Sequence, residues 1–186
     1  MEVRNISFAY GDEPVLKNVS LSLTRGRHIA VMGESGRGKT TLMRLLLGFI
    51  EPTEGVIERG QYERPAAVFQ ESRLLPWYTA LKNVELAAAP GKNAMELLED
   101  MELGESADKL PKELSGGMQR RAAIARALAF GGDLLLLDEP FSGLDPELKE
   151  RIAGKILKHA GDSPILLITH DEKEAELLKC EETVRL

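Results

Sequence analysis

The fold is decided by Gly33-Glu34-Ser35-Gly36-Arg37-Gly38-Lys39-Thr40, a stretch that matches the pattern G-x-x-x-x-G-K-S/T at every fixed position. It follows the apolar run His28–Met32 and opens into the helix-forming residues Thr41–Leu47. This order of buried strand, glycine-rich loop and helix is the context that a phosphate-binding loop requires. Glycines let several backbone N–H groups face one point, and the helix N-terminus adds partial positive charge there. The sequence therefore predicts a nucleotide phosphate site.

Within this loop, we expect the Lys39 ammonium to contact the β- and γ-phosphates and the Thr40 hydroxyl to bind Mg²⁺. The residues expected to surround the phosphates are Gly33, Glu34, Ser35, Gly36, Arg37, Gly38, Lys39, Thr40 and Thr41.

The composition is that of an ordinary globular protein. The chain has 186 residues, of which 43% are hydrophobic and 29% charged, and this length predicts a single domain with a substantial core. A net charge of −6 argues against a general nucleic-acid-binding surface. The single cysteine, Cys180, cannot form an intrachain disulfide, which fits a reducing compartment. Neither a signal peptide nor an apolar run long enough to span a bilayer is present, so we expect membrane association only through a partner.

Strand and helix patterns alternate along most of the chain. Period-two patterns predict antiparallel strands near the N-terminus, at Val3–Tyr10 and around residues 19–23, with a short strand at Val56–Glu58. Apolar runs typical of buried parallel strands occur at His28–Met32, Ala66–Phe69, Leu134–Leu137 and Ile165–Thr169, and Thr183–Leu186 is expected to form an edge strand. The sequence therefore predicts an α/β fold with a mainly parallel sheet, whose ligands bind beyond the carboxyl ends of the strands.

The segment from 71 to 118 differs from the rest of the chain in its composition and in its helix-forming pattern. Its part from Glu85 to Glu113 holds eight acidic and three basic residues, a net charge of −5, and a solvated acidic face is the default explanation. Helix-forming stretches occur at Asn83–Ala89 and Asn93–Met101. We interpret residues 71–118 as a small helical subdomain inserted into one domain, whose α/β core comprises residues 1–70 and 119–186.

Three polar residues follow buried strands and therefore meet at one edge of the sheet: Gln70, Asp138 and His170. Asp138 follows the four leucines of Leu134–Leu137, where a carboxylate can share Mg²⁺ with Thr40, and Glu139 is placed to orient or deprotonate an attacking water. His170, at the end of the next apolar run, is a candidate γ-phosphate contact, although a histidine in this position is often structural. The alternative for Glu139 is an incidental exposed acid, which this position does not favour.

A second anion site is predicted at Leu114-Ser115-Gly116-Gly117-Met118-Gln119. A serine and paired glycines open a helix that continues to Leu128, and such an N-terminus binds anions. One nucleotide does not need two anion sites. We therefore infer that this second site contacts a nucleotide bound to another subunit.

Together, these motifs resemble those of the ATP-binding-cassette (ABC) ATPases, whose signature is L-S-G-G-Q or the variant L-S-G-G-M-Q found here. The resemblance covers essentially the whole chain and includes Gln70, a D-loop at Ser142–Asp145 and His170 in the expected order. It implies a P-loop NTPase core that binds ATP and Mg²⁺, and two chains, most simply a homodimer, that sandwich two ATP molecules head to tail.

The same resemblance assigns individual roles. It implies that Tyr10 stacks on adenine, that Gln70 touches Mg²⁺ and the water, and that Glu139 is the catalytic base beside His170. The signature residues expected to close over the γ-phosphate of the partner's ATP are Ser115, Gly116, Gly117 and Gln119. Tyr10 could also be an ordinary strand-end aromatic, and Asp145 a helix cap.

The run from Gln70 to Trp77, with the pattern Q-x-x-x-L-L-P-W, is similar to the ATPases of bacterial importers for nitrate, sulfonates and taurine. This similarity implies integral-membrane permease subunits, indirectly a solute-binding protein, and a peripheral location at the cytoplasmic face of the cell membrane. Trp77, the only tryptophan, suits an interface anchor for the permease, or a core position in the helical segment.

Other readings of the sequence remain open at this point. They are a cytosolic ABC ATPase acting on ribosomes or DNA, an exporter ATPase, and a non-catalytic member of a heterodimer. The first class usually carries two cassettes or a coiled-coil insertion, and exporter cassettes are commonly fused to membrane spans. Intact Glu139, His170 and Ser115 argue against a non-catalytic role.

Overall fold

A five-stranded parallel sheet lies at the centre of the molecule. The structure, a computed structural model, describes residues 1–34 and 36–186. The strands run in the order β5-β6-β7-β3-β8. Their bounds are β3 (His28–Met32), β5 (Pro65–Val68), β6 (Leu134–Asp138), β7 (Ile165–Ile168) and β8 (Glu182–Arg185). Every residue of β3, β6 and β7 is buried, as their continuous apolar runs predict for strands covered on both faces.

The register of this sheet aligns the carboxyl ends of its three central strands. Ile168 of β7 is paired with Val31 of β3 on one side and with Asp138 of β6 on the other. The residues that follow these strands therefore leave the sheet at the same edge. This edge carries the phosphate-binding loop, the acidic pair Asp138-Glu139, and His170.

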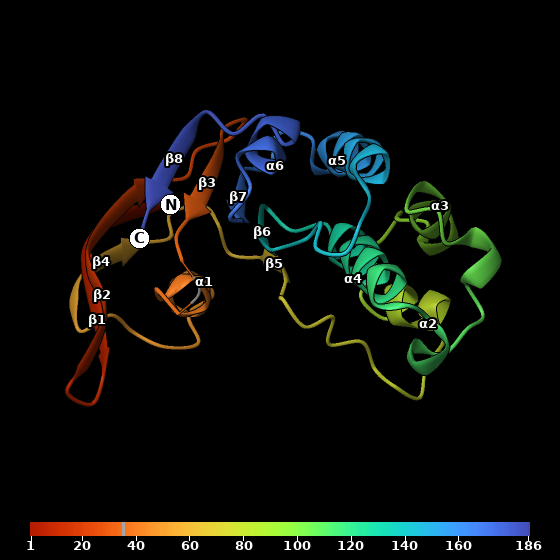
Figure 1. Ribbon diagram of the computed structural model, residues 1–186, viewed down its shortest axis with the longest axis horizontal. Coiled ribbons are helices and arrows are strands. Elements are labelled where there is room, and N and C mark those ends of the chain that lie inside the picture. Colours follow the sequence, from red (N-terminus) through yellow and green to blue (C-terminus); the bar gives the residue numbers. More distant parts are fainter. Residues whose placement is uncertain (35) are drawn as a thin grey trace.

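An antiparallel sheet forms the layer on the left of Figure 1. Its strands are β1 (Glu2–Tyr10), β2 (Glu13–Ser22) and β4 (Glu54–Glu58), in the order β2-β1-β4. Its apolar side chains join one face of the parallel sheet and the helix α1 (Lys39–Leu46) in a hydrophobic cluster that includes Ile6, Leu42 and Leu136. The predicted N-terminal antiparallel part of an α/β fold is confirmed.

The other face of the parallel sheet is covered by α4 (Gly116–Phe130), α5 (Pro146–Ala160) and α6 (Glu172–Leu177). Asp145 is a helix cap, as one interpretation of the sequence predicts, because its side chain accepts a hydrogen bond from the Leu148 N–H at 2.9 Å at the start of α5. None of the helices in residues 1–34 and 36–186 combines the length and the apolar character that crossing a membrane requires.

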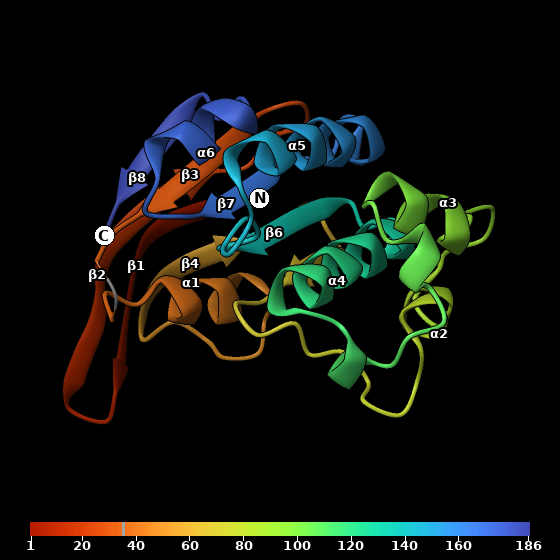
Figure 2. The same cartoon turned by 45° about the vertical axis from the view of Figure 1, so that its right-hand side comes forward.

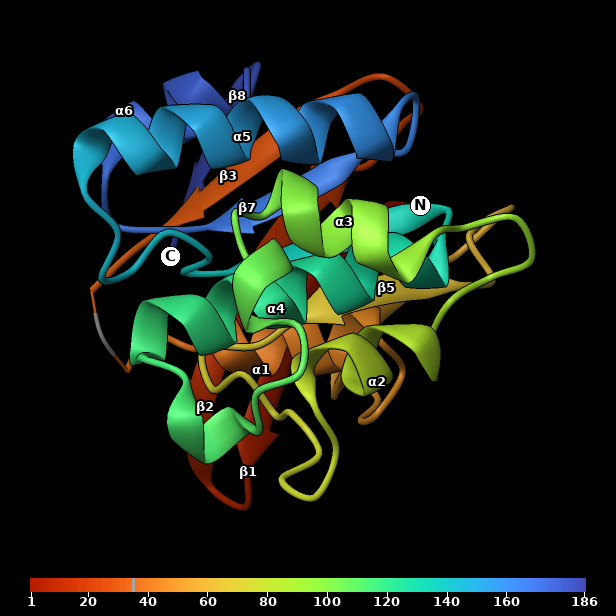
Figure 3. The same ribbon diagram turned by 90° about the vertical axis from the view of Figure 1, so that its right-hand side faces the viewer.

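Two short helices of the segment 71–118 pack against α4, as Figure 3 shows from the side. The helix α3 (Ala94–Asp100) agrees with the predicted stretch, and Asn93 caps it. The helix α2 (Ala80–Glu85) begins and ends earlier than predicted, because the Thr79 hydroxyl accepts a hydrogen bond from the Lys82 N–H and fixes its start. One-turn 3₁₀ helices follow at Gly104–Ser106 and Pro111–Glu113. The subdomain boundaries stay a prediction.

Part of the acidic charge on α3 faces α5 instead of solvent. The Asp100 carboxylate is hydrogen-bonded to Lys155 Nζ, to His159 Nε2 at 2.6 Å and to Lys158 Nζ at 3.4 Å. Its side chain is only 13% exposed, so the expectation of a solvated acidic face is wrong at this residue. Hydrogen bonds from Lys155 and His159 hold the pKa of Asp100 well below its usual range.

We expect Asp100→Asn to destabilise the protein more at neutral than at strongly acidic pH. A carboxylate whose pKa is lowered by folding stabilises the folded state above its ordinary pKa of about 4, and this contribution is lost as the pH falls through the acid range. Urea unfolding at about pH 7 and about pH 2 measures both free energies. Asp108→Asn, an exposed acid of the same segment, is the matched control. An equal loss of stability at both pH values would contradict this electrostatic explanation.

Candidate functional site

The phosphate-binding loop adopts a backbone that requires glycine. Gly36 and Gly38 have φ values of 83° and 87°, in the left-handed region. A Cβ atom at Gly38 would also lie 2.8 Å from side-chain atoms of both Val15 and Leu16. The helix α1 starts directly after Gly38, so its free N–H groups face the loop. The predicted contact of Ser35 lies outside the described residues.

A cavity of about 320 Å³ opens at this loop. It draws residues from the end of β1, the start of β2, the loop, α1 and the ends of β5 and β6. Its lining residues are Tyr10, Glu13, Val15, Gly36, Gly38, Lys39, Thr40, Thr41, Gln70, Asp138 and Glu139. All but Glu13 and Val15 are site residues predicted from the sequence. Those two follow the turn after Tyr10, and Tyr10 pairs with Glu13 across it, a proximity that no sequence motif signals.

The Lys39 ammonium is hydrogen-bonded to the phosphate-binding loop. Its Nζ donates hydrogen bonds to the carbonyl oxygens of Gly33 and Glu34, each at 2.7 Å. The positive charge is thereby kept between the loop and the cavity. A lysine in this position adds a point charge to the anion site that the α1 N-terminus provides.

Thr40 and Asp138 form the predicted hydroxyl and carboxylate pair. Thr40 Oγ1 lies 3.4 Å from Asp138 Oδ2, and Asp138 is only 3% exposed. Burial raises the pKa of Asp138, and the neighbouring charge of Glu139 raises it further. In the described part of the chain, no group of three or more His, Cys, Asp or Glu residues could hold a metal. A cation at this pair would therefore need further oxygen ligands, which a phosphate can supply.

Glu139 and His170 lie beside each other, with 3.5 Å between Glu139 Oε1 and His170 Nδ1. The Glu139 side chain is 22% exposed and that of His170 is 75% exposed. Glu139 has a φ of 47°, which is uncommon for a residue with a side chain, and its N–H donates to the Ile168 carbonyl at 2.9 Å. The main chain after β6 is thus tied to the end of β7.

The predicted residues of the loop and the strand ends divide between two cavities that share the phosphate-binding loop. His170 lines a second cavity of about 460 Å³ together with Gly33, Glu34 and Arg37. Glu34 and Arg37 are paired there, with Arg37 Nη2 at 3.2 Å from Glu34 Oε2. His170 and Glu139 therefore line different cavities, although their side chains are 3.5 Å apart.

The signature residues lie at the start of α4, apart from these cavities. Ser115 and Gly116 are exposed, and the Ser115 hydroxyl accepts a hydrogen bond from the Met118 N–H at 3.3 Å. A Cβ at Gly117 would lie 3.1 Å from Leu144 of the predicted D-loop. Among the residues that the structure describes, Ser115, Gly116, Gly117 and Gln119 line neither the 320 Å³ nor the 460 Å³ cavity.

Gln119 has contacts within its own chain. Its Nε2 donates to the carbonyl oxygens of Pro111 at 2.9 Å and Leu114 at 3.2 Å, and its Oε1 accepts from the Ser72 hydroxyl at 3.3 Å. These bonds fasten the turn before α4. A nucleotide contact by Gln119 stays a prediction.

Tyr10 sits at the mouth of the 320 Å³ cavity with 46% of its surface exposed. Its ring packs edge-on against Phe8, and its hydroxyl accepts a hydrogen bond from Arg44 Nη1 at 3.3 Å. Hydrogen bonds with Thr41 and Arg44 lower the pKa of Tyr10. The ring is thus positioned by contacts to its edge and its hydroxyl, and it remains accessible.

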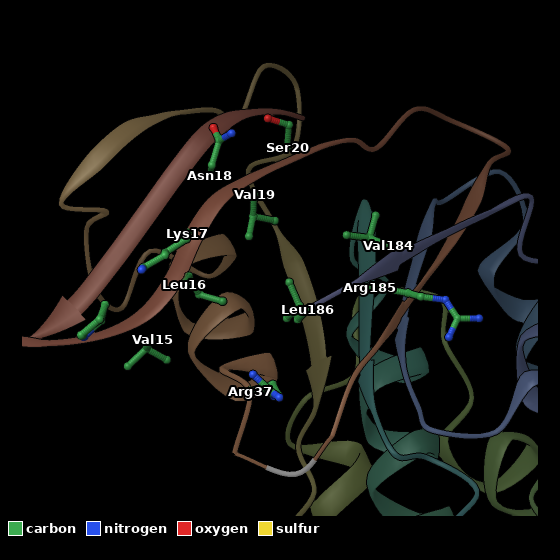
Figure 4. A pocket seen from close by; sticks show the side chains of 11 residues that line it. Val15, Leu16, Lys17, Asn18, Val19, Ser20, Arg37, Val184, Arg185 and Leu186 are labelled. Carbon is green, nitrogen blue, oxygen red and sulfur yellow. The ribbon is translucent and has the colours of Figure 1, made fainter.

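A larger cavity of about 640 Å³ adjoins the other two, because Val15 also lines the 320 Å³ cavity and Arg37 also lines the 460 Å³ cavity. Figure 4 shows it as a groove between β2 and the end of β8, with aliphatic side chains such as Val15, Val19 and Leu186 on its walls. Arg37 is the single predicted site residue that lines it. The volume of this cavity alone does not indicate a catalytic site.

Comparison with known families identifies the arrangement. The sequence profile described as "ABC transporter" matches residues 16–142, well over half of the chain. The chain belongs to the ABC transporter family. A second profile, described as "AAA domain, putative AbiEii toxin, Type IV TA system", matches the shorter range 110–175, which contains the signature and β6.

Curated relatives of this ABC chain include three importer proteins. The aliphatic sulfonates import ATP-binding protein SsuB 1 of Paracoccus denitrificans (strain Pd 1222) is 39% identical and covers 95% of this chain and 75% of the relative. SsuB of Granulibacter bethesdensis (strain ATCC BAA-1260 / CGDNIH1) is 42% identical, with coverage of 91% and 72%. The bicarbonate transport ATP-binding protein CmpD of Synechocystis sp. (strain ATCC 27184 / PCC 6803 / Kazusa) is 39% identical, with coverage of 96% and 71%.

Solved ABC structures have the same fold. The dimeric post-hydrolysis state of the ATP-binding cassette MJ0796, bound to ADP and Pi, superposes with a TM-score of 0.85 at 31% identity. The match covers 100% of this chain and 93% of that one. An ATP-binding subunit of an ABC transporter superposes with a TM-score of 0.87 at 27% identity, covering 100% and 85%. The predicted ABC fold is therefore confirmed.

We expect Lys39→Ala to weaken binding of ATP by about tenfold or more, because it removes the point charge beside the α1 N-terminus. Isothermal titration with ATP in the presence of Mg²⁺ measures the affinity. Lys17→Ala is the control, since Lys17 is an exposed lysine that lines the groove of Figure 4 instead. Equal affinity of Lys39→Ala and the unchanged chain would contradict the assignment of the phosphate-binding loop.

Proposed function

We propose that this chain is the ATP-binding and ATP-hydrolysing subunit of an ABC importer, which powers uptake of a small solute through a separate permease. The observation that carries this proposal is the 320 Å³ cavity, where the phosphate-binding loop, Gln70, the Thr40–Asp138 pair and Glu139 converge. The curated relatives are named import or transport ATP-binding proteins, and this favours an importer over the other readings of the sequence.

The residues of the cavity fit ATP and Mg²⁺. The loop N–H groups and Lys39 bind the phosphates, and the exposed ring of Tyr10 supports the adenine base. Thr40, Asp138 and Gln70 provide the oxygen ligands that Mg²⁺ prefers. When bound, this ion neutralises charge that develops on the phosphate oxygens.

Hydrolysis requires a proton acceptor for the attacking water. Glu139 fills this role because its carboxylate is partly exposed at the cavity and its main chain is fixed between β6 and β7. His170, 3.5 Å from Glu139, contacts the γ-phosphate. Mutually positioned groups of this kind act together on the transferred phosphoryl group.

The second anion site points to a dimer. Ser115 and Gly116 are exposed at the start of α4, beyond the residues that line the chain's own cavities. A second copy of this chain supplies the nucleotide for this site, and two ATP molecules lie between two chains. The dimeric structures of the cassette MJ0796 support this arrangement.

The loop after Gln70 is the proposed contact with the integral-membrane permease. Trp77 is 69% exposed, so it is not a core residue of the helical segment, and Leu75 and Tyr78 beside it are 37% and 38% exposed. Apolar and aromatic side chains at a surface favour an interface. We therefore place the protein peripherally at the cytoplasmic face of a bacterial membrane, where a permease links it indirectly to a solute-binding protein.

We predict that Glu139→Gln keeps ATP affinity but lowers kcat by about a hundredfold or more, because the amide cannot accept the proton of the attacking water. Release of phosphate from ATP measures the turnover. Glu150→Gln, an exposed glutamate on α5, should keep normal turnover. Unchanged hydrolysis in Glu139→Gln would remove this residue from its role.

The transport function is tested by isolating the complex. Tagged Glu139→Gln protein is purified from detergent-solubilised cells with ATP and Mg²⁺, and mass spectrometry identifies its partners. We expect a multi-spanning permease, and we expect Trp77→Ala in the same background to reduce its recovery, because the apolar anchor is lost.

Val56→Ala, which changes an exposed apolar residue of β4, should leave recovery of the permease unchanged. Equal recovery with Trp77→Ala would contradict the proposed docking loop. Recovery of ribosomal or DNA-bound proteins without a permease would contradict the importer function and favour a cytosolic ABC ATPase.

A further inference from the structure

The main chain of Glu139 is held on both sides. Its N–H donates to Ile168 at the end of β7, and its carbonyl accepts a hydrogen bond from Arg120 Nη1 at 3.0 Å. The Ser142 N–H is a second donor to this carbonyl, at the longer distance of 3.3 Å. Because Glu139 has a φ of 47°, its backbone adopts a conformation that surrounding contacts must maintain. Arg120 is the side chain that provides such a contact from another element.

Arg120 belongs to the helix that carries the signature residues. It lies five residues after Ser115, which is about 7.5 Å along the axis at a rise of about 1.5 Å per residue. The helix α4 is continuous over this distance. A displacement of its N-terminus therefore moves Arg120, and with it the carbonyl of Glu139.

The two other arginines of α4 contact main-chain segments other than the one that contains Glu139. Arg121 Nη1 donates to the carbonyls of Met101 and Glu102, and Arg126 donates to those of Ser72 and Arg73. Each arginine thus ties α4 to a different main-chain segment. Of the three, Arg120 is the one that reaches the acidic pair after β6.

We propose that Arg120 is a positioning residue for hydrolysis, which couples the anion site at the start of α4 to the carboxylate of Glu139. The inference rests on the proposed function. In the dimer, α4 of one chain contacts the partner's nucleotide, whereas Glu139 of the same chain acts on its own nucleotide. Arg120 therefore connects the two ATP sites through one helix and one hydrogen bond.

The test compares Arg120→Met, which keeps the length of the side chain but removes its donors, with Arg120→Lys, which keeps a donor. Loss of one hydrogen bond from a charged group predicts a kcat about tenfold lower in Arg120→Met, with KM for ATP within about twofold. Arg120→Lys should restore most of the turnover. The Hill coefficient for ATP, measured with the purified full chain, should fall toward one in Arg120→Met because the two sites are uncoupled.

Arg64→Met is the matched control, because Arg64 also donates to a main-chain carbonyl of α4, that of Phe130 at the far end of the helix. It should keep normal turnover and a normal Hill coefficient. In the Glu139→Gln background, Arg120→Met should cause no further loss of hydrolysis, since the two changes act on one group. Thermal unfolding of every variant separates a folding defect from a defect in positioning.

Three results would overturn the inference while the proposed function stands: normal kcat in Arg120→Met, an equal loss in Arg64→Met, or an undiminished further loss in Glu139→Gln. Should Arg120→Met fail to fold, Arg120→Leu, which also lacks a donor, carries the same comparison, and a normal kcat there has the same meaning. A wild-type chain that neither binds nor hydrolyses ATP would overturn the proposed function, and this inference with it.

Discussion

The parallel register of β3, β6 and β7 is the constraint on which the site depends. Val31, Ile168 and Asp138 lie side by side in this register, so the segments that follow the three strands must converge. Each strand is apolar and fully buried, and a slip by one residue would move its side chains to the opposite face. The packing of the core therefore fixes the relative positions of the loop, Glu139 and His170. Figure 2 shows β6 with α1 and α4 beside it at this edge.

Asp138 shows how function opposes stability at this edge. Its carboxylate is buried behind four leucines, and desolvation raises its pKa, so the ionised form is destabilised in the folded protein. The Thr40 hydroxyl at 3.4 Å and the charge of Lys39 offset only part of this cost. A divalent cation at the proposed Mg²⁺ site would offset it more fully.

Local sequence patterns predict much of this architecture, but contacts between distant segments escape them. The five parallel strands and the loop are recognisable in the sequence because each is a short stretch with a characteristic residue pattern and a clear boundary. By contrast, Gln119 bonds to Ser72, and Asp100 bonds to Lys155 and His159. These pairs are brought together only by packing of α3, α4 and α5. The sequence also does not predict that the site residues line two separate cavities, because this depends on the path of the chain between the end of β7 and His170.

The amino-acid composition of α4 explains why this one helix contacts several separate segments of the chain. Alanines predominate among its buried residues, for example Ala122, Ala125 and Ala129, which are fully buried. Small side chains let a helix lie close to a sheet and to neighbouring helices. Long arginine side chains can then cross the helix surface and end on main-chain carbonyls, as Arg120 and Arg126 do. If a helix held in this way moved as a unit, as the proposed role of Arg120 requires, a displacement of its N-terminus would shift the main-chain carbonyls to which its arginines donate.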